Sequence, residues 1–131
     1  MINDACFLLN KPFVHAAVIQ FYGQLITILP GESACYRCLL PKLPPQNVIQ
    51  GCKEVGVIGT TVGITGVLQA NEIIKFILGE GSLLSRKLLM IDLLNSSFKR
   101  IIVEKNPGCK LCGNNPTITS LINNQEFYSQ K

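Results

Sequence analysis

Two Cys-x-x-Cys pairs are the residues of this sequence best suited to chemistry: Cys35 with Cys38, and Cys109 with Cys112. Two thiolates at this spacing can bind the same ion, and two such pairs supply the four sulfur ligands of a tetrahedral zinc site. Because four protein ligands leave no open coordination position, the predicted Zn²⁺ is structural. Residues 39–108 separate the pairs, so the ion should tie together two distant parts of the chain.

The six cysteines admit a second interpretation, three disulfides in a small secreted protein. The sequence does not open with a basic and then apolar leader followed by a small-residue cleavage site. The repeated two-residue spacing also favours a metal over disulfides. We therefore expect a reducing cytoplasm, with four unrelated thiols as the remaining alternative.

Composition limits the other classes of protein. The chain has 131 residues, 47% of them hydrophobic and 15% charged, which excludes a disordered chain and fits one modest domain. The low charge indicates that another chain or further sequence covers part of the apolar surface. The net charge of +4 comes from scattered basic residues, so we expect no nucleic-acid partner. The uncharged stretch 55–71 is shorter than the roughly 20 residues of a membrane helix, so no membrane partner is expected either.

The apolar pattern predicts a short helix, four strands and one long helix. The short helix occupies residues 1–10 and ends before Pro12, since proline disfavours helix at the preceding residue. A turn at Tyr22-Gly23 is expected to join the first two strands. The four predicted strands are residues 13–21, 24–29, 87–94 and 98–104. Residues 41–51 hold three prolines and are predicted to be a functional loop.

The long helix is predicted over residues 55–78, ending at Gly79. Its small residues recur at alternating spacings of three and four, which places them on one face: Gly56, Gly59, Gly63, Gly66 and Ala70. Each glycine in a helix interior costs up to ~1 kcal/mol relative to alanine. We infer that this face allows the close approach of another backbone, either a sheet or a partner helix.

Seven motifs in series resemble the C-terminal half of bacterial E1-like activating enzymes, the MoeB/ThiF/HesA group. They cover most of residues 3–122 in order: NDAC (3–6), KP (11–12), QFYGQ (20–24), CYRC (35–38), GCKEVGVIG (51–59), QANEIIK (69–75) and NPGCKLCG (106–113). Enzymes of this group adenylate the C-terminal glycine of a ubiquitin-like sulfur carrier.

The resemblance implies an α/β fold, the C-terminal part of the Rossmann-like activating-enzyme domain. We expect mostly antiparallel strands, one long helix and a four-cysteine zinc knot within residues 1–113, followed by a tail over 114–131. Cys35, Cys38, Cys109 and Cys112 match the structural zinc ligands of the group position by position. The short apolar segment 118–122 of the tail is a candidate to pack on the zinc knot.

The same resemblance implies a fragment of an adenylyltransferase for molybdopterin or thiamin biosynthesis, with a MoaD-like or ThiS-like carrier as partner. The sequence has no G-x-G-x-x-G turn after a strand, so the nucleotide-binding half is missing from it. We therefore predict no cofactor-binding residues here, ATP and Mg²⁺ only in the complete family enzyme, and no activity by this chain on its own. Further partners are a sulfurtransferase, and a homodimer or a complementing N-terminal half. The alternatives are a non-catalytic zinc module that binds a ubiquitin-like protein, and a pseudogene remnant.

Cys52 is the candidate catalytic thiol. It follows the proline-rich loop and precedes the long helix, and a helix N-terminus together with the adjacent Lys53 stabilises a thiolate. In relatives, the cysteine of this motif is implicated in sulfur or acyl linkage with the carrier or a sulfurtransferase. The alternative is an inert, buried cysteine.

The remaining polar candidates are predicted to be structural. Cys6 is expected in the core, and His15 in the core or on an edge strand. Arg37 is expected to point to solvent. Glu72 and Lys75 lie three residues apart in the long helix and are predicted to form a surface ion pair.

Overall fold

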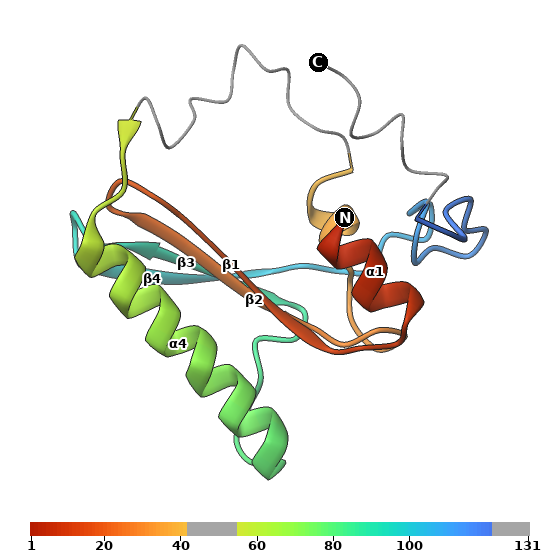
Figure 1. The fold of residues 1–131 in the computed structure, drawn as a ribbon, viewed down its shortest axis with the longest axis horizontal. Coiled ribbons are helices and arrows are strands. Elements are labelled where there is room, and N and C mark those ends of the chain that lie inside the picture. Colours follow the sequence, from red (N-terminus) through yellow and green to blue (C-terminus); the bar gives the residue numbers. More distant parts are fainter. Residues whose placement is uncertain (42–54, 122–131) are drawn as a thin grey trace. The chain divides into compact units, whose positions relative to one another are not determined.

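A computed structural model describes residues 1–41 and 55–121 (Figure 1). The chain divides into two compact units, and each unit is built from several separate segments. The cysteine unit comprises residues 1–13, 28–43 and 103–131, and the sheet unit comprises residues 14–27 and 44–102. The cysteine unit contains two short helices, α1 (Ile2–Leu8) and α2 (Tyr36–Leu39). Cys52 and nearly all of the proline-rich loop lie outside the described residues, so the predictions made for them are not tested.

Four strands form one sheet in the order β1-β2-β3-β4. Their bounds are β1 (Phe13–Ile19), β2 (Tyr22–Ile28), β3 (Lys87–Asp92) and β4 (Ser97–Ile102). Strand β3 pairs antiparallel with both β2 and β4, so that Leu89 lies opposite Leu25 on one side and Arg100 on the other. The predicted antiparallel sheet with one long helix is confirmed.

The turn of the first hairpin lies two residues earlier than predicted, at Gln20-Phe21. Gln20 adopts a left-handed backbone conformation with φ of 49°, which reverses the chain. The predicted turn at Tyr22-Gly23 is wrong, and both residues belong to β2.

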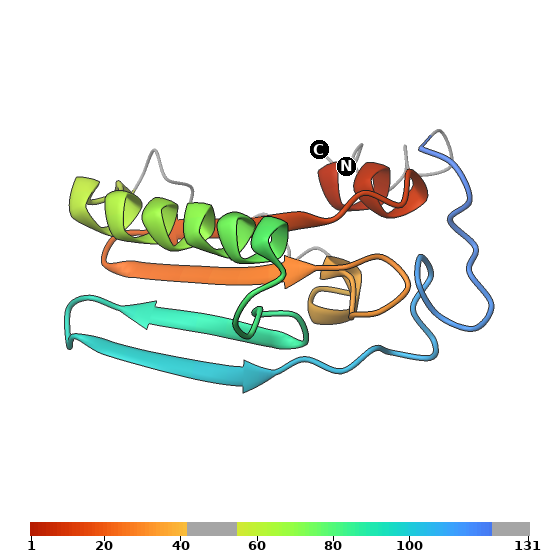
Figure 2. The same ribbon diagram turned by 90° about the horizontal axis from the view of Figure 1, so that it is seen from below.

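The long helix α4 (Gly59–Leu78) packs on the sheet through a close contact with β2. A Cβ added to Gly23 would lie 2.5 Å from the Oγ1 atom of Thr65, so a larger residue does not fit there. Leu68 packs nearby against the core formed by Leu25, Leu84, Leu89 and Ile91. Figure 2 shows α4 on the β1–β2 side of the sheet, with β4 along the opposite edge.

Helix α4 begins later than predicted and ends where predicted. Gly56 has φ of 73°, which is incompatible with a right-handed helix, and Ile58 is the N-cap. Gly79 has φ of 68° and terminates the helix in the left-handed conformation that glycine favours.

The glycine face of α4 does not contact the sheet. A Cβ added to Gly59, Gly63 or Gly66 would meet no described atom within 4 Å. The sheet is therefore not the reason for these glycines, and their packing against a partner helix stays a prediction.

The side chains that α4 buries are polar, and many that it exposes are apolar. Thr61, Thr65 and Glu72 are buried. The exposed large apolar residues of the helix are Val62, Ile64, Val67, Ile73, Ile74, Phe76, Ile77 and Leu78. With 20 residues, α4 is also long and apolar enough to count as a candidate membrane span by length and composition. Core helices of soluble domains pass the same test.

Glu72 is buried and holds the C-terminal half of α4 in place. The predicted ion pair between Glu72 and Lys75 exists, but the prediction that it lies on the surface is wrong. The Glu72 side chain accepts hydrogen bonds from Thr27 Oγ1 at 2.6 Å and Leu84 N–H at 2.7 Å, and pairs with Lys75. Burial opposes the charged form, but the bonds from Leu84, Lys75 and Thr27 together lower the pKa of Glu72.

The contact between Gly23 and Thr65 predicts a specific pair of mutational effects. Gly23→Ala should lower the free energy of unfolding by about 1–3 kcal/mol, because the added methyl group overlaps the Thr65 side chain. Thr65→Ala should recover most of that loss in the double variant. Urea denaturation of the four proteins of this cycle measures both effects.

Gly66→Ala is the matched control. Its added methyl group meets open space and improves helix propensity, so the stability should stay equal or rise by up to ~1 kcal/mol. An equal loss of stability in Gly23→Ala with and without Thr65 would contradict the packing described here.

Candidate metal centre

The four cysteines predicted as ligands meet within the cysteine unit. Cys35 is the N-cap of α2, and Cys38 follows inside that helix. Cys109 and Cys112 lie in the turns after β4, and all four Sγ atoms lie within 4.8 Å of one another. Two segments that are far apart in the sequence thus contribute one pair each.

The sulfur positions fit a single ion better than a pair of disulfides. The Sγ atoms of Cys35 and Cys109 are 3.6 Å apart, and those of Cys38 and Cys112 are 3.2 Å apart. A tetrahedral zinc ion at its usual Zn–S distance spaces its sulfur ligands about 3.8 Å apart. A disulfide bond would require about 2.05 Å.

Tight backbone turns present the second pair of cysteines. Asn106 Oδ1 accepts a hydrogen bond from Gly108 N–H at 2.8 Å, and Gly113 N–H donates to Cys109 O at 2.9 Å. A Cβ on Gly113 would lie 2.4 Å from the Pro107 carbonyl oxygen, so glycine is required where the turn closes. The Asn106 N–H group points at the Sγ atom of Cys38 at 3.4 Å, so the turn before the second pair also contacts the first pair.

Burial sets the protonation of the cluster. Burial and the neighbouring thiols raise the pKa of Cys35 well above its usual range, and burial is the main cause that raises the pKa of Cys112 to about 11. Burial also opposes ionisation of Cys109, but hydrogen bonds from the backbone N–H groups of Cys112 and Leu111 lower its pKa overall. Without a cation, Cys35 and Cys112 should therefore stay protonated at neutral pH.

A divalent cation would reverse this balance, because a metal ion deprotonates the thiols that coordinate it. Four buried sulfur ligands suit Zn²⁺ or another thiophilic ion, whereas Mg²⁺ and Ca²⁺ prefer oxygen. The donor set therefore fits a closed, structural metal site.

A buried ion pair joins α1 to the first cysteine pair. Arg37 donates from Nε to Asp4 Oδ1 at 2.7 Å and from Nη2 to Asp4 Oδ2 at 2.8 Å. The two residues are only 7% and 1% exposed. The prediction that Arg37 points to solvent is wrong, because Asp4 supplies a bidentate partner in the interior.

The signal for this pair was present in the sequence. Asp4 is an acidic residue in a short helix otherwise rich in apolar side chains, and it belongs to the same motif as Asn3. Asn3 Oδ1 accepts a hydrogen bond from Tyr36 N–H at 2.8 Å, so both residues of the motif hold α2.

The other predicted residues lie outside the cluster. Cys6 is half-buried rather than fully buried in the core. His15 lies in β1, an edge strand, and burial lowers its pKa. Among residues 1–41 and 55–121, the four-cysteine cluster is the one group of three or more metal-ligating side chains. Ile118 of the tail is buried against this cluster, as its apolar character predicted.

Comparison with known proteins gives a consistent match. The model of the ThiF family matches residues 1–111. The protein named adenylyltransferase and sulfurtransferase MOCS3 from Culex quinquefasciatus is 42% identical over 132 residues, covering 100% of this chain and 30% of that protein. The sulfur carrier protein adenylyltransferase of Thermus thermophilus is 42% identical over 132 residues, covering 97% of this chain and 49% of that protein. The chain thus spans less than half the length of these relatives.

Solved structures show the same fold. The structure of E. coli MccB with MccA-N7isoASN superposes with a TM-score of 0.71 at 19% identity, over 86% of this chain and 36% of that chain. A heterocyclase in complex with substrate and cofactor gives a TM-score of 0.69 at 19% identity, over 86% of this chain and 18% of that chain.

The ion pair between Asp4 and Arg37 predicts a large and local effect on stability. Asp4→Asn keeps the shape of the side chain but leaves the Arg37 charge buried without a carboxylate, which should cost about 3–5 kcal/mol. Thermal unfolding followed by circular dichroism measures the loss. Glu32→Gln is the matched control in the same unit, because Glu32 is exposed, and it should change stability by less than about 0.5 kcal/mol. Equal effects of the two substitutions would contradict the role given to Asp4.

Proposed function

The chain belongs to the ThiF family, and from this we propose that it is the C-terminal part of an adenylyltransferase that activates a ubiquitin-like sulfur carrier. The observation that carries the proposal is the 42% identity, across essentially the whole chain, to relatives named as adenylyltransferases. The reaction joins ATP and the C-terminal carboxylate of the carrier into an acyl-adenylate and releases pyrophosphate. The pathway served would be molybdopterin or thiamin biosynthesis.

The four-cysteine cluster holds Zn²⁺ in this proposal. Cys35, Cys38, Cys109 and Cys112 would coordinate the ion as thiolates, and the ion would supply no open position for chemistry. Its contribution is to fix the segments that carry the two pairs. Free thiols available to a metal also suit a reducing cytoplasm.

The face of the sheet turned away from α4 is the proposed docking surface for the carrier. Tyr22, Met90 and Ile101 lie on this face and are 41%, 37% and 50% exposed. Tyr22 and Met90 also line a shallow hollow of about 210 Å³ together with residues 17–19 of β1. Exposed apolar groups gathered on one face are typical of a protein-binding surface.

The nucleotide chemistry would come from another polypeptide or another part of a longer one. A glycine-rich turn at a helix N-terminus normally holds the phosphates, and this sequence has no G-x-G-x-x-G motif. The exposed apolar side of α4 supports a complementing half or a second copy as its cover. In this proposal the chain is inactive without that partner, and Cys52 supplies a thiol for sulfur or acyl transfer after adenylation.

The metal assignment predicts one equivalent of zinc per chain in protein purified without chelators, measured by plasma mass spectrometry. Cys35→Ser should reduce the zinc content by at least half, because three thiolates with one hydroxyl form a much weaker site. Cys6→Ser is the matched control, since Cys6 lies outside the cluster, and should keep the full equivalent. A zinc content far below one equivalent in the unchanged protein would exclude this assignment.

The functional assignment predicts ATP–pyrophosphate exchange only in a complemented mixture. The chain should show background exchange with a carrier ending in Gly-Gly. Exchange should appear when the region of the Thermus thermophilus relative that lies outside the match is added. Isotope exchange measured with and without each component checks this.

Three outcomes of that assay bear on the proposal. Robust exchange by the chain without a partner would show that the nucleotide site lies within it. Carrier binding without exchange in any mixture would favour the zinc-bearing binding module. Cys52→Ala should leave exchange unchanged and abolish the later transfer, and loss of exchange in this variant would contradict the assigned step.

A further inference from the structure

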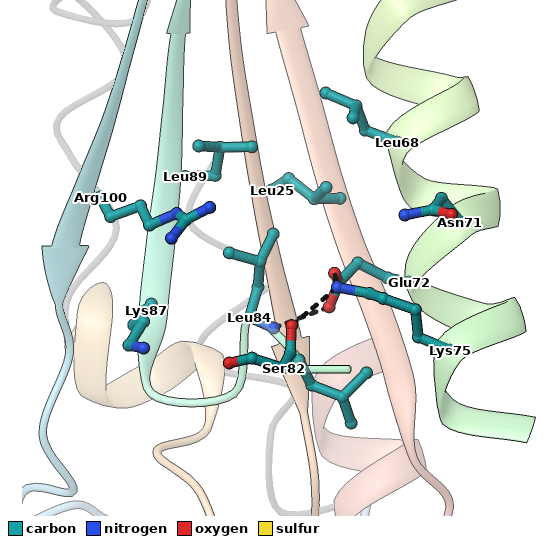
Figure 3. Close-up of a pocket in the computed structure, with 11 residues that line it drawn as sticks. Leu25, Leu68, Asn71, Glu72, Lys75, Ser82, Leu84, Lys87, Leu89 and Arg100 are labelled. Atoms are coloured by element: carbon teal, nitrogen blue, oxygen red, sulfur yellow. Dashed lines mark hydrogen bonds and ion pairs between the residues drawn. The ribbon is translucent and has the colours of Figure 1, made fainter. Parts of the chain in front are cut away.

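A cavity of about 200 Å³ lies between the C-terminal half of α4 and the sheet, entirely within the sheet unit. Leu25, Leu68 and Leu89 form its apolar walls (Figure 3). The charged side chains around it come from three elements: Glu72 and Lys75 from α4, Lys87 from β3, and Arg100 from β4.

Lys87 and Arg100 place two positive charges on the same face of neighbouring strands. Arg100 lies opposite Leu89, so Lys87 is its diagonal cross-strand neighbour at a typical separation of roughly 7–8 Å. Within the described part of the chain, neither side chain has an ion pair or hydrogen bond with an acidic group. Like charges on one face of neighbouring strands are destabilising, and an anion bound between them would relieve their repulsion.

The one carboxylate of the cavity is already neutralised. Glu72 Oε2 accepts bonds from Thr27 and Leu84, and the carboxylate pairs with Lys75, which also donates to Ser82 O at 2.8 Å. These bonds satisfy the Glu72 carboxylate, so its negative charge is largely offset and does not face a ligand unpaired. Three cations and one carboxylate leave the lining with a net charge of +2.

We propose that this cavity binds a divalent oxyanion of the size of a phosphate group, held between Lys87 and Arg100. The Arg100 guanidinium offers a planar pair of N–H donors, which suits two oxygens of one phosphate group. Lys87 adds a second charge-assisted bond, and the Asn71 amide and the Ser82 hydroxyl line the same cavity as neutral donors. The volume accommodates one such group with a few waters, since a water takes about 30 Å³.

The shared chemistry is a phosphate dianion, which a free phosphate ion or a small phosphate monoester can supply. The apolar walls distinguish the two sources, because only an ester has an organic part to contact Leu25 and Leu68. Tighter binding of glycerol phosphate than of inorganic phosphate would identify an ester as the ligand. Equal binding would identify the phosphate group as the whole determinant.

Titration of the full chain with inorganic phosphate, followed by ¹H–¹⁵N NMR at constant ionic strength in chloride, tests the proposal. The signals of Leu84, Lys87 and Arg100 should shift in a saturable manner. Lys87→Gln and Arg100→Gln should each weaken binding about tenfold, as expected for the loss of one charge-assisted hydrogen bond.

Lys99→Gln is the matched control, because Lys99 precedes Arg100 in β4 and points to the opposite face of the sheet. It removes the same charge and should weaken phosphate binding less than twofold. Equal weakening by Lys99→Gln and Arg100→Gln would overturn the site, since the effect would then follow overall charge. The absence of any saturable shift in the unchanged chain would overturn it as well. Far-UV circular dichroism verifies that each variant keeps its fold.

Discussion

Four thiols share one small volume of the cysteine unit, and this constrains how they can ionise. Their sulfur atoms lie within 4.8 Å of one another, and burial raises the pKa of two of them. Four thiolates at this distance repel one another unless a cation lies among them. The buried apolar core of this cluster adds only Leu111 and Ile118, with Phe7 packed against it, so little else among the described residues holds the two cysteine segments together. Metal binding and folding of this unit are therefore expected to be one event.

Helix α4 has a second unusual feature: it distributes polar and apolar side chains in the opposite way to a typical surface helix. Most surface helices bury an apolar stripe and expose polar side chains. Here the side that meets the sheet buries Thr61, Thr65 and Glu72, while the outer side exposes a row of large apolar residues. The small side chain of Thr65 allows the close contact at Gly23, and Glu72 fixes the other end of the helix. A helix with this distribution is suited to lie between two surfaces, the sheet on one side and an apolar partner on the other.

Local spacing predicted the strands and each Cys-x-x-Cys pair, and the preference of one metal ion for four sulfur ligands predicted that the two distant pairs meet. The wrong predictions concern residues whose partners are far away in the sequence. Arg37 finds Asp4 across 33 positions, and Glu72 finds Thr27 across 45 positions. Gly23 was predicted to be part of a turn because glycine is common in turns. In the structure it lies in β2, and it must be glycine because Thr65 of α4 packs directly on it. Spacing along the chain reports which face a residue occupies, but it does not report what that face meets.

The acidic residues and the four thiols of the described chain suit different metal ions. Mg²⁺ prefers carboxylate and other oxygen ligands. Among residues 1–41 and 55–121, Asp4 is committed to Arg37, Glu72 to Lys75 and Asp92 to Asn95. The four-thiol cluster is the one described group of three or more metal-ligating side chains, and sulfur is a poor ligand for Mg²⁺. These three carboxylates hold the chain's own elements in place, so the described cluster that best suits a metal ion is one for a thiophilic ion and not for Mg²⁺.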